Sequence, residues 1–506
     1  MLMPNENSKL SNVDKVFSSS SSISSLPTTN PIPSWWQKEY STSLTSHGKT
    51  SPLPKEVIDV VIIGSGLSGI SSALSLINQL TTTDIKLSLK DKEKPRESFG
   101  IVVMEAREFC SGATGRNGGH LISSAFLGFK SLSERFSQEE ALRAVKLEEK
   151  SIADTLEMLK NEAWTDAVDL VEGGNVHLFS TEQEKEALSE EIDAAKKAGC
   201  DVSHIEWITP QAASEQFGTA RTLTGALKLP GNNLFPIKLV TQMYKLAHQK
   251  ATASGRISLE LYTHTPVIRV FSPEEAEYPR NGKVDWTIET PRGTFSTHYV
   301  IHATNAYASY LLPQHQSNSD HAIVPTRAQV IAVRPAKQND GKAFWTNGFS
   351  ANEGFDYFFQ RPSNEKCDRP LIILGGGRNR SPPDYEFGIS DDSSLNEHVG
   401  NYLRNFLPGW FSNFWNSIKD VDVVAEWTGI MGFTKDHDPI IGPVIDQNLI
   451  VPGQFILAGY SGHGMSRAPV CAEAVAQMII SQIFNTKWYL PSWLPKHYLS
   501  TYNLDA

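Results

Sequence analysis

The chain has 506 residues, 40% of them hydrophobic and 20% charged, which is the composition of a globular protein. Its formal net charge of −10 argues against a nucleic-acid-binding surface, and no basic run offsets that charge. No apolar stretch reaches the length of a membrane span. The chain exceeds one ordinary hydrophobic core, so either two domains or one large domain with insertions is expected.

The first 55 residues are rich in Ser, Thr, Asn and Pro, with a serine run at Ser18–Ser22, and predict a mostly disordered segment. They contain no arginine and no apolar signal region, so neither a mitochondrial transit peptide nor a secretion signal is expected. Four cysteines lie far apart without a CxxC pair, which favours a reducing compartment over a disulfide framework or a metal site. We therefore expect a cytoplasmic protein without a metal, with Trp35-Trp36 packed onto the folded body.

The first glycine turn follows a buried-strand run at Val57–Ile63 and precedes a helix-compatible segment at Ile70–Ile77. Its pattern is that of a dinucleotide-binding turn. Gly64 permits the sharp bend, Gly66 lets the backbone approach a pyrophosphate, and Gly69 lets the helix and strand close together.

The second strand of such a unit is expected to end in an acidic residue that accepts hydrogen bonds from a ribose. Ile101–Met104 ends in Glu105, whereas Asp91, after Ile85–Leu89, is the competing candidate. We prefer Glu105 because its strand is more β-branched. The polar segment Thr81–Ser98, interpreted as an inserted loop, accounts for the unusually long spacing.

The segment Ser111–His120 packs four glycines, an arginine and a histidine into ten residues. Such a segment would let backbone lie against a flat ring, with Arg116 and Asn117 supplying hydrogen-bond donors. A long flexible connector is the alternative, but it leaves the Arg-Asn-Gly-Gly core between two apolar segments unexplained.

Further elements follow from periodicity. Helices are expected at Glu139–Lys160, Thr181–Ala198, Pro210–Phe217 and Lys238–Ala253, and near Tyr402–Trp415. Strands are expected at Asn175–Ser180, Ile257–Tyr262, Thr265–Phe271, Trp286–Glu289, Thr294–Tyr299, Tyr299–Ala303, Arg327–Val333, Tyr357–Gln360 and Leu371–Leu374. The stretch from 131 to 225 is interpreted as a mainly helical insertion, and residues 313–425 as a sheet-based second domain.

A second glycine cluster, Gly459–Met465, lies between a strand at Phe455–Ala458 and a helix at Ala468–Ile480. The N-terminus of such a helix offers N–H groups and the positive end of its dipole to an anionic ligand. His463 either adds positive charge there or only hydrogen-bonds a carbonyl group.

The order of these motifs resembles the D-amino-acid-oxidase-like family of FAD-dependent oxidoreductases, which includes sarcosine, glycine and γ-glutamylputrescine oxidases. The matching pieces are Val60–Gly69, Glu105, Thr114–His120, Val300–Tyr307, Gly429–Pro443 and Gly459–Met465. Trp35-Trp36 before the first strand is similar to fungal members. The resemblance implies an α/β fold, in which a discontinuous FAD-binding Rossmann domain of the glutathione-reductase type is interleaved with a sheet-based α+β substrate domain. The expected FAD domain is 56–130, 226–312 and 425–486, the substrate domain is 131–225 and 313–424, and 487–506 is a C-terminal extension.

The resemblance also implies which residues hold FAD. The pyrophosphate would be contacted by Gly64, Gly66 and Gly69, the ribose by Glu105 and the adenine by Val267. The isoalloxazine ring would be lined by Arg116, Asn117, Gly118 and Gly119. Its pyrimidine end would be lined by Gly462, His463, Gly464 and Met465. The remaining expected contacts are Ser65, Leu67, Ala106, Arg107, Thr114, His120, Ala303, Thr304, Gly429 and Gly459. His463 and Arg116 are the expected catalytic residues.

Two departures from the family bear on the chemistry. Sarcosine-oxidase-like members carry a cysteine that bonds covalently to FAD, but the corresponding stretch Trp427–Asp436 has none, so FAD is expected to be held non-covalently. Some members place a lysine over the flavin to promote reaction with oxygen, but the matching strand Leu371–Gly375 is aliphatic. The resemblance therefore leaves both an oxidase, with O2 as its electron acceptor, and a dehydrogenase, with another acceptor, open.

The expected reaction is oxidation of the C–N bond of a small amine or amino acid to an imine, by hydride transfer to the flavin. It needs orienting residues around a dry pocket rather than a nucleophile. Candidates for binding a substrate carboxylate are Arg327, Arg361, Arg378 and Arg467, and candidates for an aromatic wall are Tyr357, Phe358 and Phe359. The alternatives are a hydroxy-acid dehydrogenase with His463 as its base and a redox-silent FAD-binding regulatory protein.

Overall fold

The computed structural model of the protein describes residues 24–82, 98–123, 125–219, 222–272, 285–316, 319, 321–335, 345–362, 369–382, 384–411, 415, 419 and 421–504. The serine run, Asp91 and the strand expected at Ile85–Leu89 lie outside these residues.

The first sheet has eight strands, six of them in the order β17-β18-β11-β1-β2-β8, with β10 and β9 joined through β11. The strands are β1 (Ile58–Ile63), β2 (Phe99–Met104), β8 (Ile257–Tyr262), β9 (Arg269–Phe271), β10 (Trp286–Thr290), β11 (Gly293–His302), β17 (Ile440–Asp446) and β18 (Leu449–Ala458). The central strands β18, β11, β1, β2 and β8 pair in parallel. Their Val- and Ile-rich runs are buried, as parallel strands covered on both faces require. The expected α/β fold class is confirmed.

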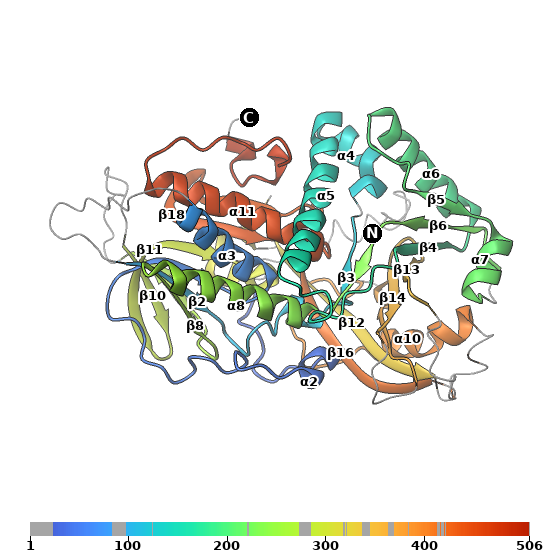
Figure 1. The fold of residues 1–506 in the computed structure, drawn as a ribbon, viewed down its shortest axis with the longest axis horizontal. Coiled ribbons are helices and arrows are strands. Elements are labelled where there is room, and N and C mark those ends of the chain that lie inside the picture. The colour runs from blue at the N-terminus through green and yellow to red at the C-terminus, as the bar shows by residue number, and fades with distance from the viewer. Residues whose placement is uncertain are drawn as a thin grey trace.

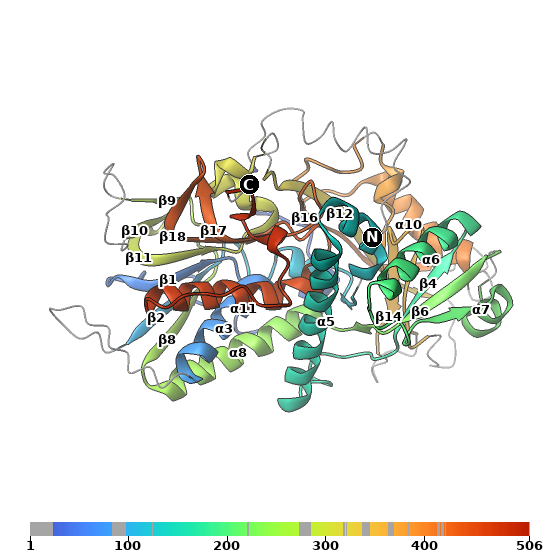
Figure 2. The same ribbon diagram turned by 90° about the horizontal axis from the view of Figure 1, so that it is seen from above.

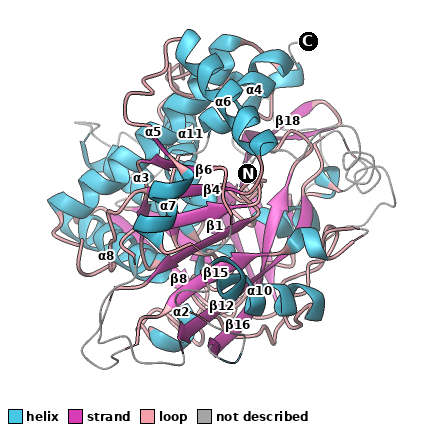
Figure 3. Ribbon diagram, turned by 90° about the vertical axis from the view of Figure 1, so that its right-hand side faces the viewer, coloured by secondary structure: helices cyan, strands magenta, loops and turns pink. Residues whose placement is uncertain are grey.

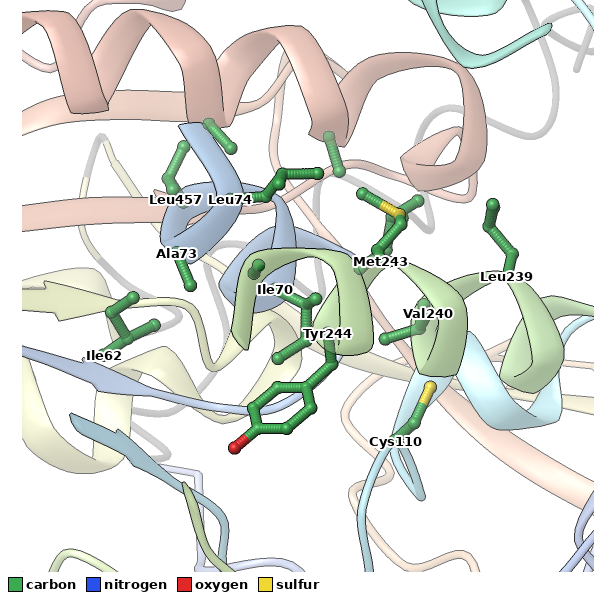
Figure 4. Close-up of a cluster of buried hydrophobic side chains, with 14 of the residues drawn as sticks. Ile62, Ile70, Ala73, Leu74, Cys110, Leu239, Val240, Met243, Tyr244 and Leu457 are labelled. Carbon is green, nitrogen blue, oxygen red and sulfur yellow. The ribbon is translucent and has the colours of Figure 1, made fainter. Parts of the chain in front are cut away.

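Three helices cover one face of this sheet: α3 (Leu67–Thr82), α8 (Pro236–Ser254) and α11 (Gly464–Ile483) (Figures 1 and 2). Buried side chains of α3, such as Ile70 and Leu74, lie with Val240 and Met243 of α8 in one apolar cluster (Figure 4). Burying each such side chain contributes roughly 1.5–3 kcal/mol. Since α3 and α11 follow the parallel strands β1 and β18, this core holds both helix N-termini at the same edge of the sheet.

The second sheet has the order β16-β12-β15-β14-β13-β4-β6-β5. Its strands are β4 (Asn175–Phe179), β5 (Glu206–Ile208), β6 (Gly225–Leu229), β12 (Val324–Pro335), β13 (Gly348–Ala351), β14 (Asp356–Gln360), β15 (Ile372–Gly376) and β16 (Val421–Phe433). Only β13 and β4 pair in parallel. Figure 3 shows the long antiparallel pair β12–β16 with α10 (Glu397–Trp410) nearby. The predicted second, sheet-based domain is therefore present.

The stretch from 131 to 225 differs from the expected helical insertion, because β4 and β5 extend the second sheet. Its helices are α4 (Phe129–Arg135), α5 (Gln138–Asn161), α6 (Glu182–Lys197) and α7 (Pro210–Phe217). In Figures 1 and 2, α5 stands between the two sheets. The expected boundaries at 225/226 and 424/425 fall inside β6 and β16, both of which belong to the second sheet.

Three other elements differ in extent from the prediction. The strand expected at Thr265–Phe271 is shorter and consists of β9 alone. Its expected first residue, Thr265, donates its N–H to the carbonyl of Glu105 rather than to a neighbouring strand. The helix expected near Tyr402–Trp415 begins earlier, where the side chain of Asn396 caps it, and ends at Trp410. The two strands expected to meet at Tyr299 form the single strand β11.

Residues 24–55 are ordered against the body, unlike the mostly disordered segment expected from composition. They carry the short helix α2 (Trp35–Glu39), whose N-terminus is closed by a capping box between Ser34 and Gln37. Trp36 is fully buried and its Nε1 donates to the carbonyl of Asn117 at 2.8 Å. Burial of Trp35 and Trp36 thus outweighs the polar composition around them. Within the described ranges, none of the helices is long and apolar enough to cross a membrane.

Candidate functional site

A cavity of about 380 Å³ opens between the two sheets. The first sheet contributes residues at the carboxyl ends of its parallel strands, where ligands of open α/β sheets bind. They are Ile63 and Gly64 after β1, Met104 to Arg107 after β2, Ala303 to Tyr307 after β11, and Tyr460 to Ser466 after β18. The second sheet contributes the facing wall, so the cavity joins the dinucleotide edge of one domain to a sheet surface of the other.

The first glycine turn is packed so closely that side chains at two of its glycines would meet backbone. Gly64 has φ of +115°, and a Cβ there would lie 2.6 Å from the carbonyl oxygen of Ala303. A Cβ on Gly69 would lie 1.9 Å from the carbonyl oxygen of Gly64, so strand and helix touch through bare backbone. The N–H of Leu67 donates to Oγ1 of Thr114 at 3.0 Å, which ties the start of α3 to the loop at 111–120.

Glu105 lies on the cavity wall at the end of β2. Its Oε2 accepts from the N–H and Oγ of Ser65 at 3.1 and 2.8 Å, and its Oε1 accepts from the N–H of Arg107 at 2.9 Å. A carboxylate has about four lone-pair positions, so this fixed orientation leaves one of them on Oε1 for a ligand hydroxyl. The preferred candidate thus lines the cavity, and its contact with a ribose stays a prediction.

Arg116 is 1% exposed and lines the cavity from the short 3₁₀ helix Ala113–Arg116. Its Nε donates to the carbonyl of Ser111 at 2.7 Å, and its Nη1 donates to the carbonyls of Ile32 and Thr428. Burial lowers the pKa of Arg116 to about 10, although Asp392 at 3.3 Å favours the charged form. The side chain is therefore a cation at neutral pH, and one buried nitrogen, Nη2, has no acceptor among the residues that the structure describes.

The second glycine cluster places the N-terminus of α11 at the other end of the cavity. Gly462, His463, Gly464 and Met465 all line the cavity, and no side chain caps the first turn. The first N–H groups of a helix lack intrahelical partners. Burial lowers the pKa of His463 well below its ordinary value, so the imidazole is neutral at neutral pH. Positive potential here comes from the helix terminus rather than from His463.

Most of the predicted cofactor residues line this one cavity. They are Gly64, Gly66, Leu67, Glu105, Ala106, Arg107, Thr114, Arg116, Asn117, Gly118, His120, Val267, Ala303, Thr304, Gly429, Gly462, His463, Gly464 and Met465. Four others stand behind it: Ser65, Gly69, Gly119 and Gly459. They shape the wall instead, since Ser65 holds Glu105, and the N–H of Gly459 donates to Oδ1 of Asn305 at 3.0 Å.

The four arginines proposed to bind a substrate carboxylate differ in whether they line the cavity. Three of them pair with carboxylates outside the cavity: Arg327 with Glu386, Arg361 with Asp169, and Arg467 with Glu148 and Asp438. Arg378 alone among the four lines the cavity. It is 6% exposed, and its guanidinium lies 4.8 and 5.1 Å from the ring centroids of Phe387 and Phe433.

The predicted aromatic wall is reduced to Tyr357, because Phe358 and Phe359 do not line the cavity. The Tyr357 ring fits between two glycines: a Cβ on Gly118 would lie 2.3 Å from its Cε2, and a Cβ on Gly375 2.5 Å from its Cζ. Burial raises the pKa of Tyr357 to about 12, so the hydroxyl stays protonated at neutral pH.

Several cavity residues carry no local sequence signal. On the second sheet, Ser350 of β13 lies 2.9 Å from Nδ1 of His177 on β4, and Nε2 of His177 lies 2.9 Å from Glu184. Leu26 and Pro27 reach the cavity from the N-terminal segment. The alternation of polar and apolar residues along β4 and β13 is the one sequence signal that could have indicated His177 and Ser350. No sequence signal indicated Leu26 and Pro27.

The fold and the cavity together define a two-domain dinucleotide-binding protein whose second sheet faces the cofactor edge of the first. The family model for the DAO family, FAD dependent oxidoreductase, matches residues 59–478. The chain belongs to this family, is an FAD-dependent oxidoreductase, and has FAD as its cofactor. The likeness to fungal members stays a prediction.

Individual relatives are distant but cover most of the chain. Glycine oxidase of Geobacillus kaustophilus is 23% identical over 425 residues, covering 83% of this chain and 92% of that protein. Gamma-glutamylputrescine oxidoreductase of Escherichia coli is 21% identical over 426 residues, covering 83% of both chains. The crystal structure of L-proline dehydrogenase from P. horikoshii has a TM-score of 0.62 at 20% identity, covering 90% of this chain and 99% of that one.

The cavity fits FAD on three observations. Gly64 and Gly66 line the cavity at the dinucleotide turn, Glu105 keeps a lone pair at the end of β2, and the buried Nη2 of Arg116 has no acceptor among the described residues. Among the described residues, no cysteine lines the cavity.

Proposed function

We propose that this protein oxidises the C–N bond of a small amino acid or another carboxylate-bearing amine to an imine, with FAD held non-covalently. The observation that carries the proposal is Arg378, a buried cation on the substrate-domain wall of the cofactor cavity. When bound, FAD supplies the hydride acceptor. The protein has to bind the substrate, orient it and exclude water.

Arg378 supports a carboxylate ligand by its charge and its surroundings. Burial lowers its pKa to about 10, so it remains protonated at neutral pH. Its Nη1 donates to the carbonyl of Tyr385 at 3.2 Å, which fixes the guanidinium on the cavity wall. A guanidinium matches a carboxylate with two parallel hydrogen bonds. Beside it, the protonated hydroxyl of Tyr357 is a further donor on the same cavity wall.

The surroundings also favour a neutral amine. Burial lowers the pKa of His120 to about 4, so its ring is uncharged where it meets Tyr357 and Phe359 edge-on at 5.4 and 5.6 Å. Oxidation needs the lone pair of an unprotonated nitrogen, and a dry pocket disfavours the ammonium form. The glycine oxidase and gamma-glutamylputrescine oxidoreductase relatives are consistent with this substrate class.

Anaerobic reduction of the bound flavin tests the proposal. Secondary amines, polyamines, D- and L-amino acids and hydroxy acids are each mixed with the holoenzyme, and loss of flavin absorbance is followed. We expect bleaching by a carboxylate-bearing amine. For that substrate, Arg378→Gln should raise the apparent dissociation constant at least tenfold, while Arg369→Gln, outside this cavity, should leave it unchanged.

The alternatives predict different outcomes of the same screen. Bleaching by hydroxy acids only would support a dehydrogenase with neutral His463 as its base, and no bleaching by any compound would support a redox-silent FAD protein. After substrate oxidation, the electron acceptor for the reduced flavin is O2 or another molecule. Stopped-flow mixing of the reduced enzyme with oxygen distinguishes an oxidase from a dehydrogenase.

A cytoplasmic location belongs to the same proposal, since Cys110, Cys200 and Cys471 are unpaired thiols, as in a reducing compartment.

A further inference from the structure

Residues 24–34, called the strap below, run across the cofactor cavity before the chain enters α2. Leu26 and Pro27 line the cavity. The strap residues on either side, Ser24 and Thr28, hydrogen-bond Ser309 and Arg107. Because Arg107 and Ser309 follow β2 and β11, Leu26 and Pro27 lie on the side of the cavity that holds Glu105. The strap therefore covers the part of the cavity assigned to the adenosine and pyrophosphate.

Hydrogen bonds fix the strap to three separate parts of the protein. At its start, the N–H of Ser24 donates to Oγ of Ser309 at 2.9 Å, and the two hydroxyl oxygens are 2.8 Å apart. Near its end, the N–H of Ile32 donates to the carbonyl of Asp392 at 2.9 Å. Oγ of Ser34 donates to the carbonyl of Gly115, in the glycine-rich loop at 111–120, at 2.7 Å.

A buried ion cluster supports the same segment. Asp392, fully buried, lies 2.9 Å from Nη1 of Arg107 and 3.3 Å from Nε of Arg116. The two arginines also donate to strap carbonyls, Arg107 to Thr28 at 3.3 Å and Arg116 to Ile32 at 2.8 Å. Two arginines on the cavity wall thus hold the strap in place over it.

The strap and the helix after it are anchored differently. In the strap, Leu26 and Pro27 are half-buried and Ser25 and Thr29 are exposed. In α2, Trp36 is fully buried in the main hydrophobic core. Separation of the strap breaks hydrogen bonds that water can replace, whereas separation of α2 also removes a buried tryptophan from the core. Opening of the strap therefore does not require α2 to leave the core.

We propose that the strap is part of the FAD site: it closes over the adenosine and pyrophosphate half of the bound cofactor and must lift for FAD to leave. Leu26 and Pro27 supply an apolar cover, and the cluster of Asp392, Arg107 and Arg116 latches it. This inference rests on FAD as the cofactor and is independent of the substrate.

Cross-linking the strap in the full-length holoenzyme tests the inference. The hydroxyl oxygens of Ser24 and Ser309 are close enough that cysteines at both positions can form a disulfide. In the double variant Ser24→Cys/Ser309→Cys, we expect the oxidised form to release FAD at least tenfold more slowly than the reduced form. Release is followed as the rise of flavin fluorescence after dilution, with the two single variants as controls for oxidation elsewhere. Equal release rates in the cross-linked and reduced forms would overturn the inference.

A second variant does not depend on disulfide formation. Leu26→Gly/Pro27→Gly removes the cover but keeps the latch, and should speed FAD release at least tenfold. The matched control Thr29→Gly/Asn30→Gly changes two exposed strap residues that do not line the cavity, and should leave the release rate near that of the unmodified protein. A release rate for Leu26→Gly/Pro27→Gly equal to that of the control would also overturn the inference.

Discussion

The Tyr357 ring depends on the absence of a side chain at Gly118, and adding one methyl group there tests the site directly. In Gly118→Ala the new Cβ would lie 2.3 Å from Cε2 and 2.7 Å from Cδ2 of Tyr357, against about 3.4 Å or more for an ordinary contact. The ring would have to move by roughly 1 Å. It cannot retreat over the sheet, because it already occupies the space where a Cβ on Gly375 would be.

The expected cost follows from this confinement. Overpacking a well-filled site costs about 1–3 kcal/mol, and the backbone at Gly118 adds no penalty, since its φ is outside the left-handed region. Gly112→Ala is the matched control in the same loop, because a Cβ there meets nothing within 4 Å. That variant should change the free energy of unfolding by less than about 0.5 kcal/mol.

A double-mutant cycle in urea or guanidinium separates the clash from other effects. If the cost of Gly118→Ala comes from the Tyr357 ring, the double variant Gly118→Ala/Tyr357→Ala should be more stable than the sum of the single effects predicts, by about 1 kcal/mol or more. FAD affinity should fall in Gly118→Ala and recover partly in the double variant. Additive effects on unfolding would show that the ring is not the obstacle.

Three further variants test other parts of the structure. Arg467→Met should lower the free energy of unfolding by about 3–5 kcal/mol, because it removes a buried cation that pairs with the carboxylates of both Glu148 and Asp438; a loss under 1 kcal/mol in denaturant unfolding would contradict the pairing. His497→Gln should flatten the pH dependence of stability above pH 6.5. Burial alone would lower the pKa of His497, but its carboxylate partners Asp438 and Glu140 raise it above 6.5. The stability that protonated His497 contributes is therefore complete below pH 6.5 and is lost as the pH rises through the higher pKa of the folded state. An unchanged pH profile in thermal unfolding would refute this. Gly69→Ala, with a Cβ 1.9 Å from the carbonyl oxygen of Gly64, should yield protein without flavin colour, and a normal visible spectrum would show that the turn tolerates a side chain.

The cofactor half of the cavity was predictable because its signals are local. Gly69 packs against Gly64 in the same turn, and Glu105 directly follows its strand. In each case a residue type and its short spacing suffice to predict the geometry. The same holds for Gly462 and Gly464, where a strand, a turn and a helix are consecutive in the chain.

The substrate half was not predictable in this way, because long-range strand pairing builds it. Ser350 meets His177 only because β13 pairs in parallel with β4, which comes from a distant part of the sequence. Nor does any local pattern separate Arg378 from Arg327, since both lie at or near strands of the same sheet. Their difference is that Glu386 pairs with Arg327, whereas Arg378 reaches the cavity.

The interleaving of the two domains explains why the cofactor and the facing wall meet at all. After β2 the chain leaves the first sheet through the loop that carries Arg116, and after β11 it leaves again through the segment that carries Tyr307. Each departure starts at the carboxyl end of a parallel strand, so each passes the cofactor edge before it enters the second sheet. Asp392, on a loop of the second domain, then pairs with Arg116 and Arg107 of the first. We therefore expect a change in that loop to alter both the strap and the glycine-rich loop at 111–120, and so to alter FAD binding.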